Sequence, residues 1–290
     1  MRTGVASEVR ERLRAADMNR LAAFLKTRRI KGRKALTAFL FSNNYMKASF
    51  WIRENLFPVL YPRRCPACGR VLAYGNLICR DCRASLPWIK EPSCFLCGKP
   101  VYSEEQELCY DCRRFKKSFQ AGVSLLLYNE ETRPIIADFK YHNRRSLSRY
   151  FAEEIRARYA SRLASWNPGL IVPVPVHKHR KRIRGYNQAG LVARDLSVLT
   201  GIPYIPDLLL RSSDTTPLKK LTAQARLDHL KKAFEFNLDY KELAVGGKSV
   251  LLIDDIYTTG ATLEICTRTL MDAGFGPVYI CTLCTGVARD

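Results

Sequence analysis

The chain has 290 residues, of which 47% are apolar, and its 48 Lys plus Arg against 27 Asp plus Glu give a formal net charge of +21. This length and apolar content predict one or two folded domains with a buried core, and exclude a collagen-like or low-complexity chain. The longest apolar runs fall far short of the ~20 residues that a membrane-spanning helix needs, so we expect no transmembrane segment.

Residues 1–55 are predicted to be a basic N-terminal extension. Residues 1–60 carry 13 basic and 4 acidic groups, more positive charge per residue than the rest of the chain. Residues 8–25 favour a helix but lack a continuous apolar stripe, which indicates a partly ordered arm rather than a packed domain. Two interpretations stay open: a true extension, or an upstream start codon that the cell does not use, with Met46 as the native start.

Residues 56–118 contain a short internal repeat of Cys-x-x-Cys pairs. Cys65-Pro-Ala-Cys68-Gly-Arg recurs 29 residues later, and Cys79-Arg-Asp-Cys82-Arg recurs 30 residues later. Each unit is too small to fold on a hydrophobic core alone, so the pattern predicts a double zinc ribbon. The expected metal ligands are Cys65, Cys68, Cys79, Cys82, Cys94, Cys97, Cys109 and Cys112.

Four thiolates per ion leave no open coordination position, so we expect two structural Zn²⁺ sites. Gly69 and Gly98 leave the chain free to turn and aim backbone N–H groups at the sulfurs. An iron–sulfur cluster would use the same ligands. Sequential pairing is the simplest arrangement, and a crossed pairing is the alternative. Thiolate ligands indicate a reducing compartment, which predicts a cytoplasmic protein.

Residues 119–290 show strands alternating with amphipathic helices, which predicts an α/β domain with a parallel sheet and helices on both faces. The predicted strands are Val123–Tyr128, Leu170–Val176, Ser249–Ile253 and Val278–Leu283. The predicted helices are Arg133–Lys140, Leu147–Tyr159, Asn187–Thr200, Thr222–Phe234 and Thr262–Ala273.

The second predicted strand leads into a basic segment. His177–Arg184 holds five Lys or Arg in eight residues, which suits a diphosphate, and Gly185 permits a tight turn before the next helix. The alternative is an ordinary solvated basic loop. We expect His177 and His179 to be loop residues rather than general bases.

The third predicted strand ends in Asp254 and Asp255, and a Thr- and Gly-containing loop, residues 258–262, then opens a helix. A helix N-terminus favours a phosphate, and Gly260 lets the backbone approach it closely. Two carboxylates at the carboxyl end of a strand suit sugar hydroxyls and a hydrated magnesium ion. The alternative is a turn with a solvated acidic pair. Cys281 and Cys284 lie in the last predicted strand and are expected, with Cys266, to be buried and inert.

Residues 250–262 resemble the phosphoribosyl diphosphate (PRPP) motif of type I phosphoribosyltransferases. Residues 171–189 are similar to the diphosphate loop of the ComF (ComFC) competence-protein family, and Phe139-Lys140-Tyr141 resembles that family's Lys-bearing segment. With the Cys repeat in front, the resemblance covers residues 56–290 and implies a type I phosphoribosyltransferase-like fold. Residues 211–234 resemble the family's mobile flap, but Leu218 and His229 stand where Gln and Asn are usual.

The resemblance implies a set of site residues. The catalytic candidates are Asp254, Asp255, Lys140 and Arg184. The PRPP-binding candidates are Thr258, Thr259, Gly260, Ala261, Thr262, Pro173, Val174, Pro175, Arg180 and Arg182. Purine-salvage relatives carry an Asp as general base at the position of Thr258, so a purine acceptor is not expected here.

The ComF resemblance implies a role in natural transformation, with PRPP, Mg²⁺, single-stranded DNA and a DNA-translocating competence helicase as ligands and partners, at the inner face of the membrane. The positive charge suits single-stranded DNA, as do the aromatic residues Phe50, Trp51, Tyr61 and Trp88. The alternative is an active phosphoribosyltransferase of unknown acceptor in nucleobase or nucleotide metabolism.

Overall fold

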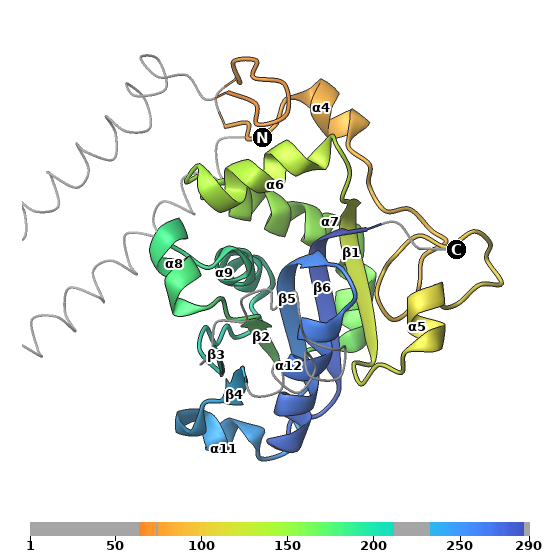
Figure 1. Ribbon diagram of the computed structural model, residues 1–290, viewed down its shortest axis with the longest axis vertical. Helices are drawn as coiled ribbons and strands as arrows, with labels where there is room; N and C mark the ends of the chain where they lie inside the picture. The colour runs from red at the N-terminus through yellow and green to blue at the C-terminus, as the bar shows by residue number, and fades with distance from the viewer. Residues whose placement is uncertain (1–63, 74, 212–232, 287–290) are drawn as a thin grey trace, which may run out of the picture. The chain divides into compact units, whose positions relative to one another are not determined.

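A computed structural model describes residues 64–73, 75–211 and 233–286 (Figure 1). Residues Arg63–Asp290 belong to one compact unit. In the part of the chain that is described, no helix is long and apolar enough to cross a membrane. Several predictions lie outside the described residues: the basic extension at 1–55, the aromatic residues Phe50, Trp51 and Tyr61, flap residues Leu218 and His229, and the predicted helix from Thr222 up to residue 232.

Four parallel strands form the central sheet in the order β1-β6-β5-β2. They are β1 (Ala121–Leu127), β2 (Leu170–Pro173), β5 (Val250–Tyr257) and β6 (Val278–Thr285). All four were predicted, but β2 ends three residues earlier and β5 ends four residues later than expected. β5 continues because its carboxyl half stays paired with β6, as in the register of Asp254 with Thr282, after β2 has ended.

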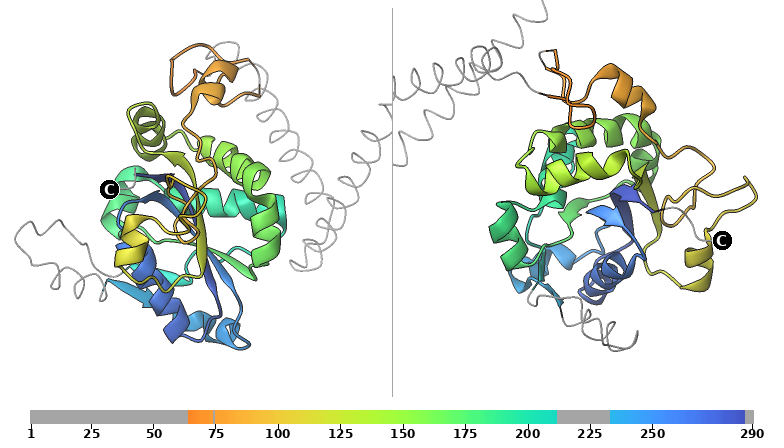
Figure 2. Two further views of the ribbon diagram at one scale, coloured as in Figure 1. Left: turned by 90° about the vertical axis from the view of Figure 1, so that its right-hand side faces the viewer. Right: turned by 45° about the horizontal axis from the view of Figure 1, so that its top comes forward.

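Helices cover both faces of the sheet (Figure 2). One face packs against α6 (Thr132–Tyr141), α7 (Leu147–Trp166) and α9 (Gln188–Thr200), and the other packs against α12 (Ala261–Asp272). Alternate residues of β5 enter the two cores, Leu251 on the side of α7 and Leu252 on the side of α12. A strand buried on both faces is apolar throughout, as this one is before its acidic pair. The predicted α/β fold class is confirmed.

Two helices differ from the sequence prediction. The helix predicted to end at Tyr159 continues as α7 to Trp166, and Tyr159 is a kink with φ −118° and ψ 20°. The segment predicted as a basic loop forms a short helix, α8 (Lys178–Arg184), between an N-terminal cap from the His177 side chain and the left-handed Gly185 at φ 77°. Basic residues with good helix propensity explain this second difference.

Short elements complete the described fold. An antiparallel pair, β3 (Leu209–Arg211) with β4 (Phe234–Phe236), lies outside the main sheet. The helical turns η2 (Leu238–Tyr240) and α11 (Lys241–Ala244) then lead to β5. Phe234, predicted to end a helix, is therefore a strand residue.

The two Cys-rich repeats pack on opposite faces of the sheet. The first, with helix α4 (Arg80–Ser85), shares the core of α6 and α7, and the second, with α5 (Tyr110–Arg114), shares the core of α12. The segment between them runs antiparallel to β1, with Trp88 opposite Leu126, and Ile89 N–H donates to Leu125 O at 3.1 Å. This segment covers the otherwise unpaired edge of β1.

Candidate functional site

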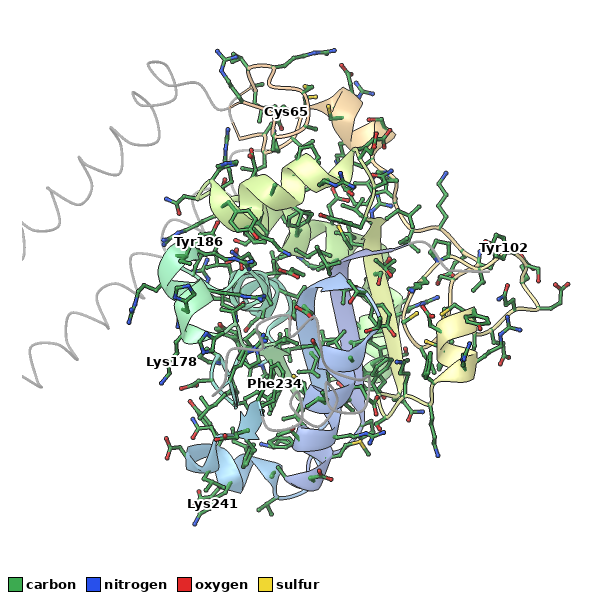
Figure 3. All side chains as sticks on the ribbon, viewed as in Figure 1. Cys65, Tyr102, Lys178, Tyr186, Phe234 and Lys241 are labelled. Carbon is green, nitrogen blue, oxygen red and sulfur yellow. The ribbon has the colours of Figure 1, made fainter. Side chains whose placement is uncertain are left out.

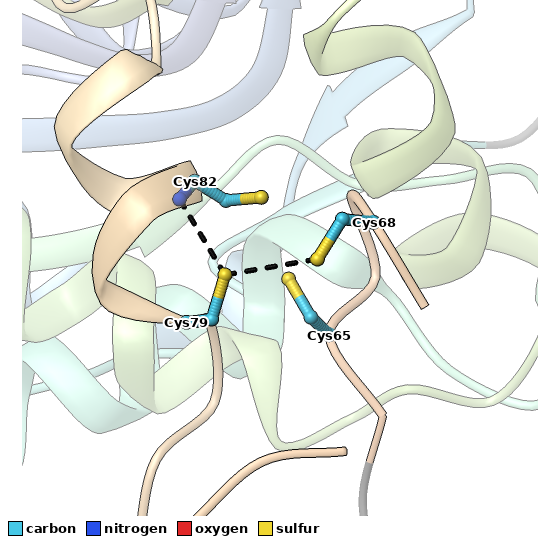
Figure 4. Close-up of side chains that lie close together, drawn as sticks. All are labelled: Cys65, Cys68, Cys79 and Cys82. Carbon is cyan, nitrogen blue, oxygen red and sulfur yellow. Dashed lines mark hydrogen bonds between the residues drawn. The ribbon is translucent and has the colours of Figure 1, made fainter. Parts of the chain in front are cut away.

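The structure brings the eight ribbon cysteines together as two separate groups of four. Cys65, Cys68, Cys79 and Cys82 form the first, drawn in Figure 4, and Cys94, Cys97, Cys109 and Cys112 form the second. Within each group all sulfurs lie within 4.8 Å of one another. Zinc–sulfur bonds of ~2.3 Å in a tetrahedron place sulfurs roughly 3.8 Å apart. The Cys68–Cys79 and Cys97–Cys109 sulfur distances of 3.7 and 3.6 Å match this, so the pairing is sequential.

The repeats share one backbone design around the metal. In each, the first Cys N–H donates to a carbonyl five residues ahead, from Cys65 to Arg70 O at 2.8 Å and from Cys94 to Lys99 O at 2.7 Å. Gly69 and the corresponding Gly98 take φ 73° and 70°, which a glycine allows without strain. The predicted turns are therefore present, and closed four-thiolate sites make the zinc structural.

At least one thiol in each group has a lowered pKa, whereas burial and hydrogen bonds within the groups raise the pKa values of Cys82, Cys97 and Cys112. Burial raises the pKa of Cys65, but backbone N–H groups of Cys79, Cys68 and Ala67 outweigh it and lower the pKa to about 7. A hydrogen bond from Cys112 lowers the pKa of Cys109 to about 7. Thiolates are the metal-binding form, so the lowered pKa values favour zinc.

The remaining three cysteines are buried as predicted, in β6 and α12. Burial raises the pKa of Cys281 to about 12, and it also raises the pKa values of Cys266 and Cys284. None of the eleven cysteines of the chain forms a disulfide bond.

The acidic pair lies in the carboxyl half of β5, next to the end of β2. Asp255 forms an ion pair with Lys140 at the end of α6, with 2.8 Å between Nζ and Oδ2. Asp254 accepts a hydrogen bond from the Asp255 N–H at 2.8 Å. Three of the predicted catalytic residues therefore form one charged cluster, in which Lys140 neutralises one carboxylate.

Asp254 differs electrostatically from its neighbour. Burial and then the negative charge of Asp255 raise the pKa of Asp254 to about 7, against smaller lowering effects from the Asp255 N–H, Lys140 and Arg211. This carboxyl group is thus poised near neutral pH, so a cation beside it would displace a proton. Arg211, at the end of β3, is a charge neighbour of Asp254 that sequence reasoning placed only in the flap.

The Thr- and Gly-containing loop lies between β5 and α12, where the sequence predicted it. Gly260 is the N-cap of α12, with φ 74°, and Thr258 and Thr259 are exposed. Gly260 has no side chain to cap the first-turn N–H groups, and the Thr259 hydroxyl accepts from Ala261 N–H at 3.4 Å. An anion would meet these N–H groups at the positive end of a twelve-residue helix.

The predicted diphosphate loop begins at the same edge of the sheet. Pro173 is opposite Ile253 in the register, and Val174 N–H donates to Ile253 O at 2.9 Å. Pro175 follows and is half-buried, and the Asn187 amide donates to Val174 O at 3.0 Å. The loop therefore starts one residue away from Asp254 across the strand pair.

The basic residues of α8 divide into two kinds. Arg180 and Arg182 are exposed, whereas Arg184 packs on the Tyr141 ring at 5.0 Å and donates to its hydroxyl at 3.1 Å. Tyr186, labelled in Figure 3, donates from its hydroxyl to Phe139 O. Arg184 is therefore attached to the Phe139–Tyr141 segment, which also carries the Lys140 that pairs with Asp255.

A cavity of about 620 Å³ lies beside the diphosphate loop, between α8, α9 and β3. Its walls combine the loop residue Pro175 with Tyr204 and with the basic side chains Lys178, Lys181 and Arg194. Asp207 and Glu235 add acidic groups.

Two further residues at this site were missed. Lys117 donates from Nζ to Thr259 O at 3.0 Å, and Tyr257 is 1% exposed beneath Gly260. Lys117 belongs to a basic run after the last Cys pair, which could have marked it. Tyr257 carries no signal in the sequence, because its partners lie up to 145 residues away.

Comparison with known proteins identifies a matching domain and several relatives. Residues 56–113 match the double zinc ribbon domain. The chain is 29% identical over 221 residues to Competence protein F of Haemophilus influenzae, which covers 75% of this chain and 94% of the relative. It is 28% identical to Competence protein ComFC of Bacillus subtilis, over 68% of this chain and 79% of the relative. It is 29% identical to DNA utilization protein YhgH of Escherichia coli, over 77% and 97%.

The chain is similar over most of its length to competence proteins of the ComF family. The matched double ribbon and the relatives together span most of the described residues, so the predicted resemblance is confirmed. Its fold is an α/β domain with a parallel sheet, joined to a double zinc ribbon with two groups of four cysteines. The double ribbon and the acidic pair both belong to the compact unit Arg63–Asp290.

Proposed function

We propose that this protein binds PRPP with Mg²⁺ and acts on incoming DNA in natural transformation. The observation that carries the PRPP proposal is the position of Asp254 and Asp255 on β5, between a helix N-terminus and the start of the diphosphate loop. Acids for ribose hydroxyls, N–H groups for the 5-phosphate and a basic segment for the diphosphate thus meet at one edge of the sheet.

The residues fit a magnesium ion that arrives with the ligand. Among the described residues, only the two cysteine groups bring three or more metal-binding side chains together. Mg²⁺ needs no such cage, since it commonly binds one or two carboxylates, substrate phosphates and water. Bound there, it would supply positive charge to the diphosphate, while Asp254 and Asp255 hold the sugar and Lys140 forms an ion pair with Asp255.

The DNA proposal draws on the relatives and on one described surface. The relatives' names concern competence and DNA utilization. On α5 of the second ribbon, Arg114 lies over the rings of Tyr110 and Phe115 at 5.9 and 5.6 Å, and Phe115 is 56% exposed. Basic and aromatic side chains side by side suit single-stranded nucleic acid.

Trp88, by contrast, does not serve as a stacking surface. It is half-buried, Arg158 covers its ring at 3.7 Å, and its indole N–H donates to Arg83 O at 2.9 Å. The aromatic surface that we propose for DNA binding is therefore the one on α5, and not Trp88. The proposal has two further parts. The thiolate zinc sites favour a cytoplasmic location. The resemblance to the ComF family implies a DNA-translocating helicase as partner at the inner face of the membrane.

Calorimetric titration with PRPP in the presence and absence of Mg²⁺ tests the first part. We expect Mg²⁺-dependent binding that the double variant Asp254→Asn/Asp255→Asn loses. Single-stranded DNA should still bind this variant, whereas Arg114→Ala/Phe115→Ala should weaken DNA and leave PRPP binding unchanged. No PRPP binding by the folded wild-type protein would reject the ligand. DNA affinity that does not fall with rising salt would reject the nucleic-acid surface.

A second candidate function is a phosphoribosyltransferase reaction. The cavity beside Pro175 favours it, because its 620 Å³ would hold an acceptor next to the diphosphate loop. The residues would act electrostatically, by orienting the ribose and offsetting charge on the departing diphosphate. Release of diphosphate from PRPP in the presence of candidate acceptors, and its loss on Asp254→Asn, would establish the enzyme. Binding without turnover for every acceptor would leave the binding role alone.

A further inference from the structure

The two zinc ribbons share a design but have different surroundings. In the first, the exposed pair Arg70–Asp81 spans 2.6 Å. The same positions in the second hold Lys99 and Asp111, also 2.6 Å apart, with the Lys99 side chain only 4% exposed. All four cysteines of the second ribbon are buried, whereas Cys68 of the first is exposed. The second ribbon is therefore built into the domain, and its inner side faces Tyr257.

Tyr257 lies between the second zinc site and the Thr- and Gly-containing loop of residues 258–262, which we call the phosphate loop. Its hydroxyl oxygen is 4.0 Å from Cys112 Sγ, and Lys99 Nζ lies 5.6 Å from the centre of its ring. The residue is the last of β5 and is 1% exposed. A zinc-bound Cys112 is a thiolate, so the phenol would donate a hydrogen bond to a charged sulfur.

The phosphate loop rests on the same ring. A Cβ atom at Gly260 would lie 2.4 Å from the Tyr257 hydroxyl and 2.6 Å from Cζ, so the loop backbone is in direct contact with the tyrosine. No side chain separates the two. Any displacement of the tyrosine would therefore displace the N-terminus of α12.

Residues that follow the second ribbon hold the loop from its other side. Lys117 Nζ donates to Thr259 O at 3.0 Å. Ser118 donates from both its N–H and its hydroxyl to the carboxylate of Glu264, each at 2.7 Å, in the first turn of α12. The first ribbon contacts the opposite face of the sheet, with Arg83 paired to Glu154 of α7.

We propose that Tyr257 is a positioning residue through which the second zinc site, and not the first, holds the phosphate loop in its anion-binding conformation. Occupied by zinc, Cys112 fixes the tyrosine and the tyrosine supports Gly260. Without zinc in the second ribbon, the loop loses its support from below. That the loop binds a phosphate depends on the proposed function, whereas the structural coupling between the second zinc site and the loop does not.

The duplicated ribbons offer a matched pair of variants of the full chain. Cys79→Ser and Cys109→Ser alter corresponding ligands, and each should reduce the bound zinc from two to one per chain. We expect hydrogen–deuterium exchange in residues 257–264, measured without ligand, to rise about tenfold in Cys109→Ser and to stay at the wild-type rate in Cys79→Ser. Equal exchange in the two variants would overturn the proposal.

Tyr257→Phe removes the hydroxyl and retains the ring under Gly260, which tests the tyrosine where Cys109→Ser fails to fold. It should keep two zinc ions and wild-type exchange in α7, while residues 257–264 exchange several-fold faster. A merely structural role for the tyrosine would raise exchange throughout the sheet, and unchanged exchange in the loop would also count against the proposal. If the wild-type chain shows the coupling but binds no PRPP, the proposed function fails and this inference stands.

Discussion

Lys140 and Asp255 are joined by an ion pair of 2.8 Å that links the end of α6 to β5, and both side chains are less than one-fifth exposed. Two features of the proposed site, the Lys-bearing segment at residues 139–141 and the acidic pair, are thereby linked. An ion pair with little access to water is costly to break by removing one partner, because the other charge is left unpaired.

We therefore expect Lys140→Met to lower the free energy of unfolding by about 2–3 kcal/mol. The double variant Lys140→Met/Asp255→Asn should recover part of this loss, since no charge is then left alone. Urea unfolding followed by circular dichroism measures both. As a control, Arg149→Ala breaks the exposed Arg149–Glu153 pair and should cost less than about 0.5 kcal/mol. Similar losses at the two pairs would contradict the burial argument.

Asp254 predicts a pH dependence of stability. Burial and the charge of Asp255 raise its pKa from 3.8 to about 7 in the folded protein. The folded state therefore holds a proton that the unfolded chain releases, so this group's contribution to stability falls as the pH rises from about 4 to 7. Asp254→Asn should be more stable than the wild type at pH 8, and the difference should shrink toward pH 4 in melting experiments. A pH-independent difference would show that Asp254 does not titrate in this range.

The affinity for the ligand should change with pH in the opposite direction to the stability. A cation at Asp254 needs the ionised carboxylate, so affinity for Mg²⁺ and PRPP should rise with pH through about 7. Isothermal titration at pH 6 and pH 8 measures this, and Asp254→Asn should lose the part of the trend that is due to this residue. An identical pH trend in the variant would assign the dependence to another group.

Gly260→Ala should destabilise the protein through two separate effects. The glycine has φ 74°, and an added Cβ would lie 2.4 Å from the buried Tyr257 hydroxyl. We expect a loss of about 2–4 kcal/mol, from left-handed backbone strain plus overpacking. Gly201→Ala is the matched control, because Gly201 has φ 78° with no atom within 4 Å, and should cost only about 1–2 kcal/mol. Equal losses in the free energy of unfolding would mean that the Tyr257 side chain moves to accommodate the methyl group.

Zinc release should occur in two phases. Cys68 of the first site is exposed, whereas the second site is fully buried. A chelator that reports zinc by colour should remove one ion quickly and the other only as the second ribbon opens. Cys79→Ser should abolish the fast phase. Release of both ions in one phase would show that the two ribbons open together.

Local pattern was sufficient to predict much of this structure. The Cys spacing gave the two metal groups, and apolar runs bounded by turn residues gave the four strands. The acidic pair and the loop before α12 were also found, because adjacent residues in a strand–loop–helix segment are near in space by necessity. What could be predicted was therefore contained within short stretches of the chain, of which the cysteine groups at residues 65–82 and 94–112 are the longest.

The remainder depends on contacts between distant segments. β5 passes the expected end at Ile253 only because β6 continues to pair with it. Arg184 was predicted in the diphosphate segment, but its contact with the hydroxyl of Tyr141, 43 residues earlier, could not be predicted from the sequence. Tyr257 reads as an ordinary strand residue until Cys112 and Gly260 are seen on either side of it.

The pairing of the segment around Trp88 with β1 affects whether the α/β domain can exist as a monomer on its own. Because this segment belongs to the linker between the ribbons and pairs with β1, a chain shortened to begin after the ribbons would expose the bare backbone of β1. Exposed strand edges recruit other strands, so such a fragment would self-associate. By pairing with β1, the ribbon region thus prevents a strand of a neighbouring molecule from adding to this edge of the sheet.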